Sequence, residues 1–252
     1  MKTWPYPKLF AHRGGGSLAP ENTLAGMKKA QEIGFIAVEF DVKMSGDNIA
    51  ILMHDETLER TTNGTGAVKD KTYQELAGLD AGSWRSPTYR GERIPKFTEV
   101  AHYLHGMGIM ANVEIKPCPG REQETGKLVA ELCHSLWQDR TVKPLLTSFS
   151  FQALEAAHRA VPELPRGFLV ETPAPEHLVQ LAALDCVSLN CDHSGIDEAS
   201  VKFFQQRGYR ILTYTVNDPN RVRTLLQWGI DGIFTDNLSE MADEFHDAMV
   251  RV

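Results

Sequence analysis

Two short segments of the chain, residues 38–42 and 112–116, carry charged side chains at alternate positions between apolar ones. In a β-strand alternate side chains share a face, so Glu39 and Asp41 lie together, and Glu114 lies on the polar face of the second segment. A buried carboxylate needs a partner, and one divalent cation can pair with three of them. The pattern therefore predicts a metal site formed by Glu39, Asp41 and Glu114.

The ligand atoms of this predicted site are all carboxylate oxygens. Such oxygens suit Mg²⁺ or Ca²⁺, with Mn²⁺ as a further candidate, better than zinc, which prefers His and Cys. The alternative is that the three acids are ordinary strand residues paired with Lys or Arg. With a divalent cation, Arg13 and Lys116 would give the site a small net positive charge, which suits a phosphodiester monoanion.

Two histidines, His12 and His54, are the candidates for acid–base catalysis because each stands at the end of a predicted strand. An imidazole titrates near neutral pH, so it can accept a proton from an attacking group or donate one to a leaving alkoxide. Cleavage of a phosphodiester needs both transfers, which predicts one histidine on each side of the phosphorus. The remaining histidines are expected to be structural: His102, His105, His134, His158, His177, His193 and His246.

Arg13 is a candidate phosphate-binding residue, because a guanidinium group matches two phosphate oxygens in a fork. The three glycines after it let the backbone approach a ligand closely, although such a triplet is equally typical of a flexible loop. Glu21 is expected to support Arg13 or the metal from just outside the site, and Asp55 is expected to lie in the same outer layer. Asn22 and Thr23 are interpreted as the cap of a helix.

Strand-like segments alternate with amphipathic helical segments along most of the chain, which implies a parallel sheet. At this length we expect a closed (β/α)8 TIM barrel, with an open doubly wound sheet as the alternative. Active sites of such barrels lie at the carboxyl ends of the strands. The expected strands are Leu9–His12, Ala37–Val42, Ile109–Lys116, Leu145–Ser148, Gly167–Val170, Cys186–Asn190, Ile211–Val216 and Gly232–Thr235. The expected helices are Asn22–Ile33, Phe97–Gly106, Glu122–Trp137, Phe151–Ala160, Glu176–Ala183, Glu198–Gly208 and Asn220–Gly229.

One part of the chain departs from this alternation. A turn at residues 45–48 is followed by a second short strand, Ile49–His54, and a turn this short predicts an antiparallel hairpin. Residues 56–95 are rich in Thr, Gly, Asp and Arg, with one short helical piece around residues 73–77. We interpret residues 56–95 as an insertion over one mouth of the barrel, and residues 1–252 as a single catalytic domain.

The composition is that of an ordinary globular protein, with 42% hydrophobic and 23% charged residues among 252. The net charge of -7 argues against nucleic-acid binding through the overall field. Neither a signal-peptide-like start nor an apolar run of transmembrane length is evident, so we expect a cytoplasmic protein without membrane insertion. The four cysteines form no CxxC pair and are expected to be reduced thiols. No pattern specifies an oligomeric state.

Several blocks of the sequence together resemble the glycerophosphodiester phosphodiesterase family. The blocks are His12-Arg13-Gly14, Pro20-Glu21-Asn22-Thr23, Glu39-Phe40-Asp41-Val42, His54-Asp55 with Leu58–Gly64, and Glu114-Ile115-Lys116. Five blocks in this order and at these separations are highly specific. The resemblance continues more weakly through Thr213–Asn217 and Gly229–Asp236. The compact length and the absence of a leader are similar to the cytosolic bacterial members.

The resemblance implies a TIM barrel with a small inserted subdomain after the second strand and its hairpin. It also implies metal-dependent hydrolysis of glycerophosphodiesters, the deacylated headgroups of phospholipids, to sn-glycerol 3-phosphate and an alcohol. The implied roles are acid–base catalysis by His12 and His54, metal binding by Glu39, Asp41 and Glu114, and phosphate contact by Arg13 and Lys116. We favour His54 as base and His12 as acid, with water or the substrate's own 2-hydroxyl as the attacking group. Many relatives carry Trp where this chain has Tyr214, which is expected to shape the glycerol or headgroup pocket.

Two alternatives remain at this point. A related phosphodiesterase on the same scaffold, such as a lysophospholipase D or a phosphoinositide-cleaving phospholipase, would need contact with acyl chains or a membrane. A non-catalytic barrel that senses glycerophosphodiesters would be expected to lack a histidine or carboxylate of the set, whereas all of them are present.

Overall fold

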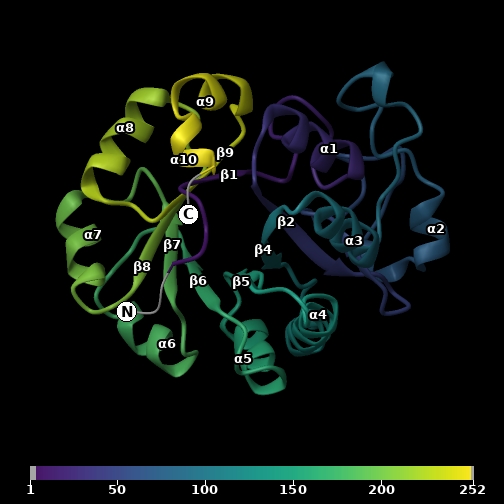
Figure 1. Ribbon diagram of the computed structural model, residues 1–252. Coiled ribbons are helices and arrows are strands. Elements are labelled where there is room, and N and C mark those ends of the chain that lie inside the picture. Colours follow the sequence, from purple (N-terminus) through teal and green to yellow (C-terminus); the bar gives the residue numbers. More distant parts are fainter. Residues whose placement is uncertain (1–3, 251–252) are drawn as a thin grey trace.

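The computed structural model describes residues 4–250, and its centre is a closed barrel of eight parallel strands (Figure 1). The barrel strands are β1 (Leu9–Ala11), β2 (Ala37–Met44), β4 (Met110–Ile115), β5 (Leu145–Ser148), β6 (Arg166–Val170), β7 (Ser188–Asp192), β8 (Arg210–Tyr214) and β9 (Gly232–Thr235). Strand β1 pairs with β9 on one side and with β2 on the other, which closes the sheet. The predicted TIM barrel is confirmed, and the open-sheet alternative is wrong because β1 has both neighbours.

Helices surround the barrel in Figure 1 and connect its strands. They are α1 (Leu24–Ile33), α3 (Phe97–Met107), α4 (Glu122–Leu136), α5 (Phe151–Ala160), α6 (His177–Ala183), α7 (Glu198–Gln205) and α8 (Pro219–Trp228), followed by α9 (Leu238–Glu244) and α10 (His246–Val250). Apolar side chains on α1, α3 and α5 pack in one cluster with the outward-facing residues of the strands. Helices α9 and α10 were not expected from the sequence, whereas the seven helices before them lie close to their predicted positions.

The barrel interior changes from apolar to polar toward the carboxyl ends of the strands. One layer of buried rings and aliphatic groups includes Phe10, Leu145, Leu212 and Phe234. On β2, Val38, Phe40 and Val42 belong to the outer cluster between sheet and helices. Because side chains alternate along a strand, Glu39 and Asp41 face the barrel interior instead.

The predicted hairpin is present, because β3 (Ala50–Leu52) pairs antiparallel with β2. Between β3 and α3 the chain forms two single-turn 3₁₀-helices, Val68–Asp70 and Pro87–Tyr89, and a short helix α2 (Tyr73–Ala77). This segment has an apolar cluster of its own, formed by Ile51, Met53, Leu58, Val68, Leu76, Ala81 and Ile94. It is therefore packed around its own small core and returns the chain to the barrel at α3.

All but two of the expected strands differ from the observed ones by one or two residues at an end. The strand expected at Cys186–Asn190 lies at Ser188–Asp192, because Cys186 and Val187 belong to the buried connection from α6. The strand expected to run to Val216 ends at Tyr214. Residues 186–187 and 215–216 are each apolar or β-branched, so sequence pattern alone does not separate them from the adjacent strand.

Two further predictions from the sequence are that the cysteines are reduced and that no segment crosses a membrane. All four cysteines lie in the described part of the chain, and each is buried with a free thiol. Among residues 4–250, no helix is both long and apolar enough to cross a bilayer.

Candidate functional site

The three predicted metal ligands come together at the carboxyl end of the barrel. Glu39 and Asp41 project from β2, and Glu114 projects from β4, where it is the register partner of Asp41. One carboxylate oxygen from each residue lies within 4.8 Å of the other two. The register of two parallel strands thus brings together acids that are about 75 positions apart in the sequence.

The electrostatics of this cluster favour a cation. Burial, together with the charge of Asp41, raises the pKa of Glu39 above its usual range. Asp41 is also buried, but the positive charges of Arg13 and Lys116 hold its pKa low. One oxygen of Glu39, Oε1, is buried and has no hydrogen-bond partner among residues 4–250. An orphaned buried carboxylate oxygen and an all-oxygen donor set fit a hard divalent cation, so the cluster could hold one.

Basic side chains neutralise part of this negative charge, in line with the alternative that the acids are paired with Lys or Arg. Lys116 Nζ lies 2.9 Å from Glu114 Oε1 and 3.7 Å from Asp41 Oδ1, and Arg13 Nε lies 3.5 Å from Asp41 Oδ2. Glu39 accepts a hydrogen bond from the backbone N–H of Arg13 at 3.0 Å, and no Lys or Arg ion pair with it is found among residues 4–250. Pairing with Lys and Arg therefore accounts for two of the three acids and leaves Glu39 without such a partner.

Asn22 holds Asp41 rather than capping the helix. Its Nδ2 donates to Asp41 Oδ2 at 2.8 Å, and its Oδ1 accepts from the backbone N–H of Asp41 at 3.0 Å. The cap of α1 is Thr23 alone, whose hydroxyl accepts from the N–H of Gly26. The interpretation of Asn22 as a helix cap is wrong, because the residue turns with φ 56° and points its amide into the site.

His12 follows β1 and is held by an acid from the other end of the chain. Its Nδ1 lies 2.8 Å from Asp236 Oδ1, and its Nε2 lies 3.7 Å from Glu39 Oε2. Burial works against a charged ring, but the hydrogen bond to Asp236 and the charge of Glu39 outweigh it and raise the pKa of His12. Asn217 in turn accepts from the backbone N–H of Asp236 at 2.8 Å. Asn217 and Asp236 end the two more weakly resembling blocks of the sequence, but no site role is predicted for either.

His54 follows β3 and is held by its sequence neighbour. Its Nδ1 lies 2.6 Å from Asp55 Oδ1. Burial and the nearby charges of Arg13 and Lys116 lower the pKa of His54 despite the opposing effect of Asp41 and Asp55. Both histidines are therefore bound through Nδ1 to a carboxylate, which leaves Nε2 of each ring as the atom available for proton transfer.

A cavity of about 260 Å³ connects these groups. It is lined by His12, Arg13, Glu39, His54, Asn112, Glu114, Lys116, Thr147, Phe149, Leu169, Tyr214, Thr215 and Phe234. Tyr214 forms part of its apolar wall, because its ring packs edge-on against Phe149 with centroids 5.8 Å apart, and its hydroxyl donates to the carbonyl of Val170. The cavity thus offers ionic groups on one side and aromatic surface on the other.

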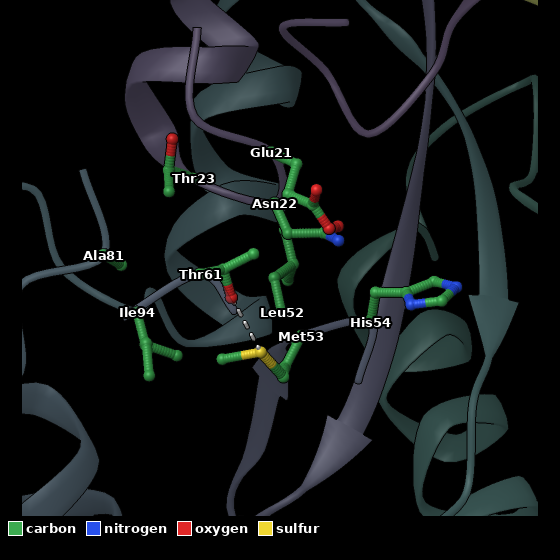
Figure 2. A pocket seen from close by; sticks show the side chains of 9 residues that line it. All are labelled: Glu21, Asn22, Thr23, Leu52, Met53, His54, Thr61, Ala81 and Ile94. Atoms are coloured by element: carbon green, nitrogen blue, oxygen red, sulfur yellow. Dashed lines mark hydrogen bonds between the residues drawn. The ribbon is translucent and has the colours of Figure 1, made fainter. Parts of the chain in front are cut away.

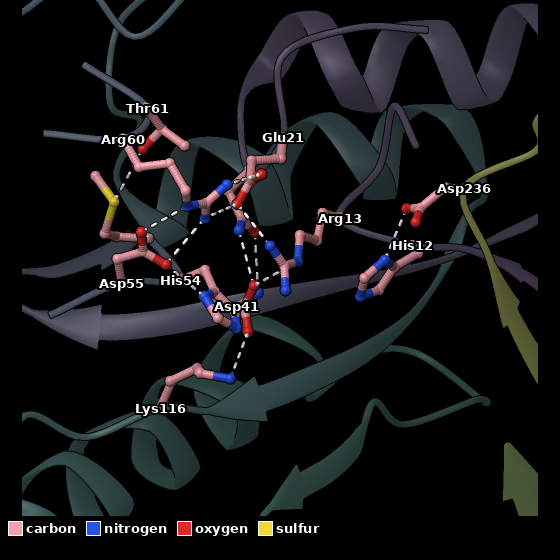
Figure 3. Close-up of polar contacts among 12 residues, drawn as sticks. His12, Arg13, Glu21, Asp41, His54, Asp55, Arg60, Thr61, Lys116 and Asp236 are labelled. Carbon is pink, nitrogen blue, oxygen red and sulfur yellow. Dashed lines mark hydrogen bonds and ion pairs between the residues drawn. The ribbon is translucent and has the colours of Figure 1, made fainter. Parts of the chain in front are cut away.

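Arg13 and Glu21 meet as expected, with Nη1 of Arg13 2.8 Å from Oε1 of Glu21. Glu21 and Asp55 also share a second partner, Arg60, which lies between them in Figure 3. The small pocket drawn in Figure 2 lies behind His54, whose ring points away from it. At about 10 Å³ this pocket has no more room than a single water requires, so the 260 Å³ cavity is the candidate substrate site.

A second, wider hollow of about 440 Å³ borders the other side of His12 and Arg13. Its wall includes Trp84 and Arg85 from the segment between β3 and α3, and Asn217 and Asp236 from the barrel. His12 and Arg13 thus stand between an inner cavity in the barrel mouth and an outer hollow partly walled by the predicted insertion.

The sequence of this chain matches a known family over most of its length. The model of the glycerophosphoryl diester phosphodiesterase family matches residues 12–240, a span that contains every candidate site residue. A glycerophosphodiester phosphodiesterase of Caldanaerobacter subterraneus subsp. tengcongensis is 32% identical over 91% of this chain and 93% of its own. One of Bacillus subtilis is 33% identical over 90% of this chain and 82% of its own.

Solved structures show the same relationship. A phosphodiesterase of Oleispira antarctica, solved in complex with the product sn-glycerol-3-phosphate, is 34% identical, with a TM-score of 0.89 over 94% of this chain and 96% of its own. The site geometry, the match to the family model and these relatives agree with one another. The chain therefore belongs to the glycerophosphoryl diester phosphodiesterase family and is a phosphodiesterase.

Proposed function

We propose that this phosphodiesterase hydrolyses glycerophosphodiesters to sn-glycerol 3-phosphate and an alcohol, with a divalent cation and two catalytic histidines. The observation that carries the proposal is one cavity lined by His12, His54, Glu39, Glu114 and Lys116 together. The complex of the Oleispira antarctica relative with sn-glycerol-3-phosphate supports the same product for this chain.

Glu39, Asp41 and Glu114 would hold the cation, for which we propose Mg²⁺ or Ca²⁺, with Mn²⁺ as a substitute. The all-oxygen donor set and the unpaired Oε1 of Glu39 support this choice. When bound, such a cation supplies Lewis-acid polarisation of a phosphoryl oxygen. The neighbouring Arg13 and Lys116 would bind the other phosphate oxygens, since both border the cavity beside the acidic cluster.

The two histidines would exchange protons with the substrate. In the proposed step, Nε2 of His54 accepts the proton of the attacking oxygen as its bond to phosphorus forms. The bond from phosphorus to the alcohol oxygen breaks, and Nε2 of His12 donates a proton to that oxygen. Support comes from the Nδ1 contacts with Asp55 and Asp236, because an acid bound at Nδ1 fixes the tautomer and directs Nε2 toward the reacting group.

The glycerol end of the substrate would occupy the aromatic side of the cavity. Tyr214 and Phe149 provide an apolar wall there, and the hydroxyl of Tyr214 is already engaged by Val170. Tyr214 would therefore shape the pocket through its ring and would not serve as an acid or base. Residues 1–252 would act as one catalytic domain, to which the insertion at residues 56–95 adds the outer wall that contains Trp84 and Arg85.

Product identification tests the proposal. The purified protein is incubated with Mg²⁺ and either glycerophosphocholine, glycerophosphoethanolamine, glycerophosphoglycerol or lysophosphatidylcholine, and the products are resolved by chromatography. We expect sn-glycerol 3-phosphate from the glycerophosphodiesters and little turnover of the lysophospholipid. Faster turnover of lysophosphatidylcholine would favour the lysophospholipase D alternative, and release of a phosphorylated alcohol would show that the other phosphoester bond is cleaved.

A further inference from the structure

Arg60, in the segment between β3 and α3, binds two carboxylates at once (Figure 3). Its Nε and Nη2 lie 2.6 Å from Oδ2 and 2.9 Å from Oδ1 of Asp55. Its Nη1 and Nη2 lie 2.7 Å from Oε2 and 2.8 Å from Oε1 of Glu21. The planar fork of one guanidinium is thus used on both acids, a geometry that a lysine ammonium cannot reproduce.

Each of these carboxylates also holds a group that faces the cavity. Asp55 Oδ1 contacts Nδ1 of His54 at 2.6 Å, and Glu21 Oε1 contacts Nη1 of Arg13 at 2.8 Å. Arg13 continues the chain of contacts to Asp41, whose Oδ2 lies 3.5 Å from its Nε. Through two acids, Arg60 is therefore connected to both a candidate proton-transfer group and a candidate phosphate-binding group.

The acids that Arg60 joins come from separate parts of the fold. Glu21 lies in the connection from β1 to α1, whereas Asp55 lies just after the hairpin strand β3. A bond from either acid to its own partner does not set the distance between the two parts. The guanidinium does so, because all four of its bonds end on those two side chains.

We propose that Arg60 is a positioning residue for the phosphodiesterase reaction, which fixes His54 and Arg13 relative to each other by clamping Asp55 and Glu21. The inference rests on the roles proposed above for His54 and Arg13. Arg60 is not among the residues that line the 260 Å³ cavity, so it acts through the two carboxylates. Its effect is therefore expected on turnover first, with substrate affinity reduced as Arg13 loses its support.

Catalytic and structural effects of Arg60 can be separated because its side chain is 45% exposed. Ion pairs in contact with solvent contribute little to stability. Replacement by methionine keeps most of the aliphatic stem and removes the guanidinium, so the melting temperature should fall by no more than about 2–4 °C. Loss of the clamp should lower kcat by about 10- to 100-fold, the range typical of residues that orient a catalytic or metal-binding side chain.

The test compares Arg60→Met and Arg60→Lys with the wild-type enzyme in Mg²⁺, with glycerophosphocholine as substrate. Arg93→Met is the matched control, because Arg93 is an exposed arginine of the same segment whose side chain donates a hydrogen bond to a backbone carbonyl, that of Ala77. We expect kcat to fall about tenfold or more in both Arg60 variants and to stay within twofold of wild type in Arg93→Met. Values within twofold of wild type for both Arg60 variants would overturn the inference.

A second comparison asks whether Arg60 acts through the two carboxylates. Arg60→Met is introduced into an enzyme that already carries Glu21→Gln and Asp55→Asn. If the clamp is the mechanism, the additional loss in kcat is less than twofold, because its targets are gone. An equal loss in both backgrounds would show that Arg60 acts elsewhere and would overturn the inference. Absence of glycerophosphodiester turnover in the wild type and in Arg93→Met would instead contradict the proposed function itself.

Discussion

The Nδ1 atom of His12 lies 2.8 Å from Oδ1 of Asp236, although the two residues are 224 positions apart. The contact exists because β1 and β9 are neighbours in the closed barrel, with Ala11 opposite Thr235 in register. His12 and Asp236 directly follow these paired residues, so they meet where β1 and β9 close the barrel. His54 has the same kind of support from Asp55, but within a single turn of the chain.

Replacement of Asp236 by asparagine should lower kcat while leaving KM nearly unchanged. The carboxylate accepts the Nδ1 proton of His12 and so directs Nε2 toward the cavity, whereas an amide can offer a donor and favour the other tautomer. We expect a decrease of about 10- to 100-fold, measured by steady-state kinetics with a glycerophosphodiester.

The matched control for this variant is Asp192→Asn. Asp192 ends β7 at the same rim of the barrel and accepts hydrogen bonds from Ser194. It should retain wild-type kcat. Equal kcat in Asp236→Asn and wild type would show that the contact with His12 has no catalytic consequence.

Both histidines should be required for hydrolysis of glycerophosphocholine. Only one of them should remain necessary when the leaving group needs no proton. His12→Ala and His54→Ala are each expected to lower kcat on glycerophosphocholine by about 10²- to 10⁴-fold, with the fold intact by circular dichroism. If His12 protonates the leaving alcohol, a p-nitrophenyl phosphodiester should restore much of the rate in His12→Ala, because nitrophenolate leaves without a proton. His54→Ala should remain slow with both substrates.

The opposite pattern of rescue would exchange the two roles. Near-normal turnover of glycerophosphocholine in either alanine variant would remove that histidine from the mechanism. The leaving-group comparison is needed because both rings have a carboxylate at Nδ1, so contact geometry does not by itself distinguish the acid from the base.

Glu39→Gln should abolish tight binding of a divalent cation. The wild-type protein is expected to bind one Mn²⁺ per chain by calorimetry and to gain thermal stability from it, since a ligand that binds the folded state stabilises it. Affinity should fall by more than about 100-fold in the variant, because even residues that merely support a metal ligand cost about 10- to 100-fold when changed. Glu171→Gln, at the carboxyl end of β6, is the control and should bind Mn²⁺ like wild type. Equal affinities in the two variants would contradict the assignment of Glu39 as a ligand.

Local patterns in the sequence are sufficient to predict most of the fold and the acidic cluster. The alternation of Glu39 and Asp41 with apolar neighbours identifies which face of the strand is polar, and parallel pairing then brings Glu114 to Asp41. The strands at Leu145–Ser148 and Gly232–Thr235 have the predicted bounds, because turn-forming residues mark both ends.

Contacts that depend on closure of the barrel or on the reach of long side chains could not be predicted from local sequence patterns. Asp236 follows a correctly predicted strand, but its partner is set by the seam between β1 and β9, which no local pattern encodes. Arg60 lies in an irregular segment, and its two partners come from different loops. Asn22 resembles a helix cap by residue type, yet its positive φ directs its amide to Asp41. Asp236 lies just beyond a predicted strand end, where polar site residues are expected, whereas Arg60 and Asn22 do not.

A pair of helix glycines should respond in opposite directions to alanine. Gly126 in α4 packs against α5, and an added Cβ would lie 2.0 Å from the backbone oxygen of Ala153, whereas a Cβ on Gly106 in α3 would meet nothing within 4 Å. Alanine is the better helix former by about 1 kcal/mol. We expect Gly106→Ala to stabilise the protein by up to that amount and Gly126→Ala to destabilise it by about 1–3 kcal/mol. Urea unfolding measures both, and a stabilised Gly126→Ala would contradict the close approach of α4 and α5.

The measurement closest to the central claim follows glycerophosphoethanolamine by ³¹P NMR, first in excess chelator and then after addition of Mg²⁺. The central claim is that the acidic cluster holds a required cation between two proton-transferring imidazoles. If so, the diester signal should persist in chelator and should be replaced by that of sn-glycerol 3-phosphate once Mg²⁺ is supplied. Hydrolysis at the same rate in chelator, or an unchanged diester in Mg²⁺, Mn²⁺ and Ca²⁺ alike, would contradict it.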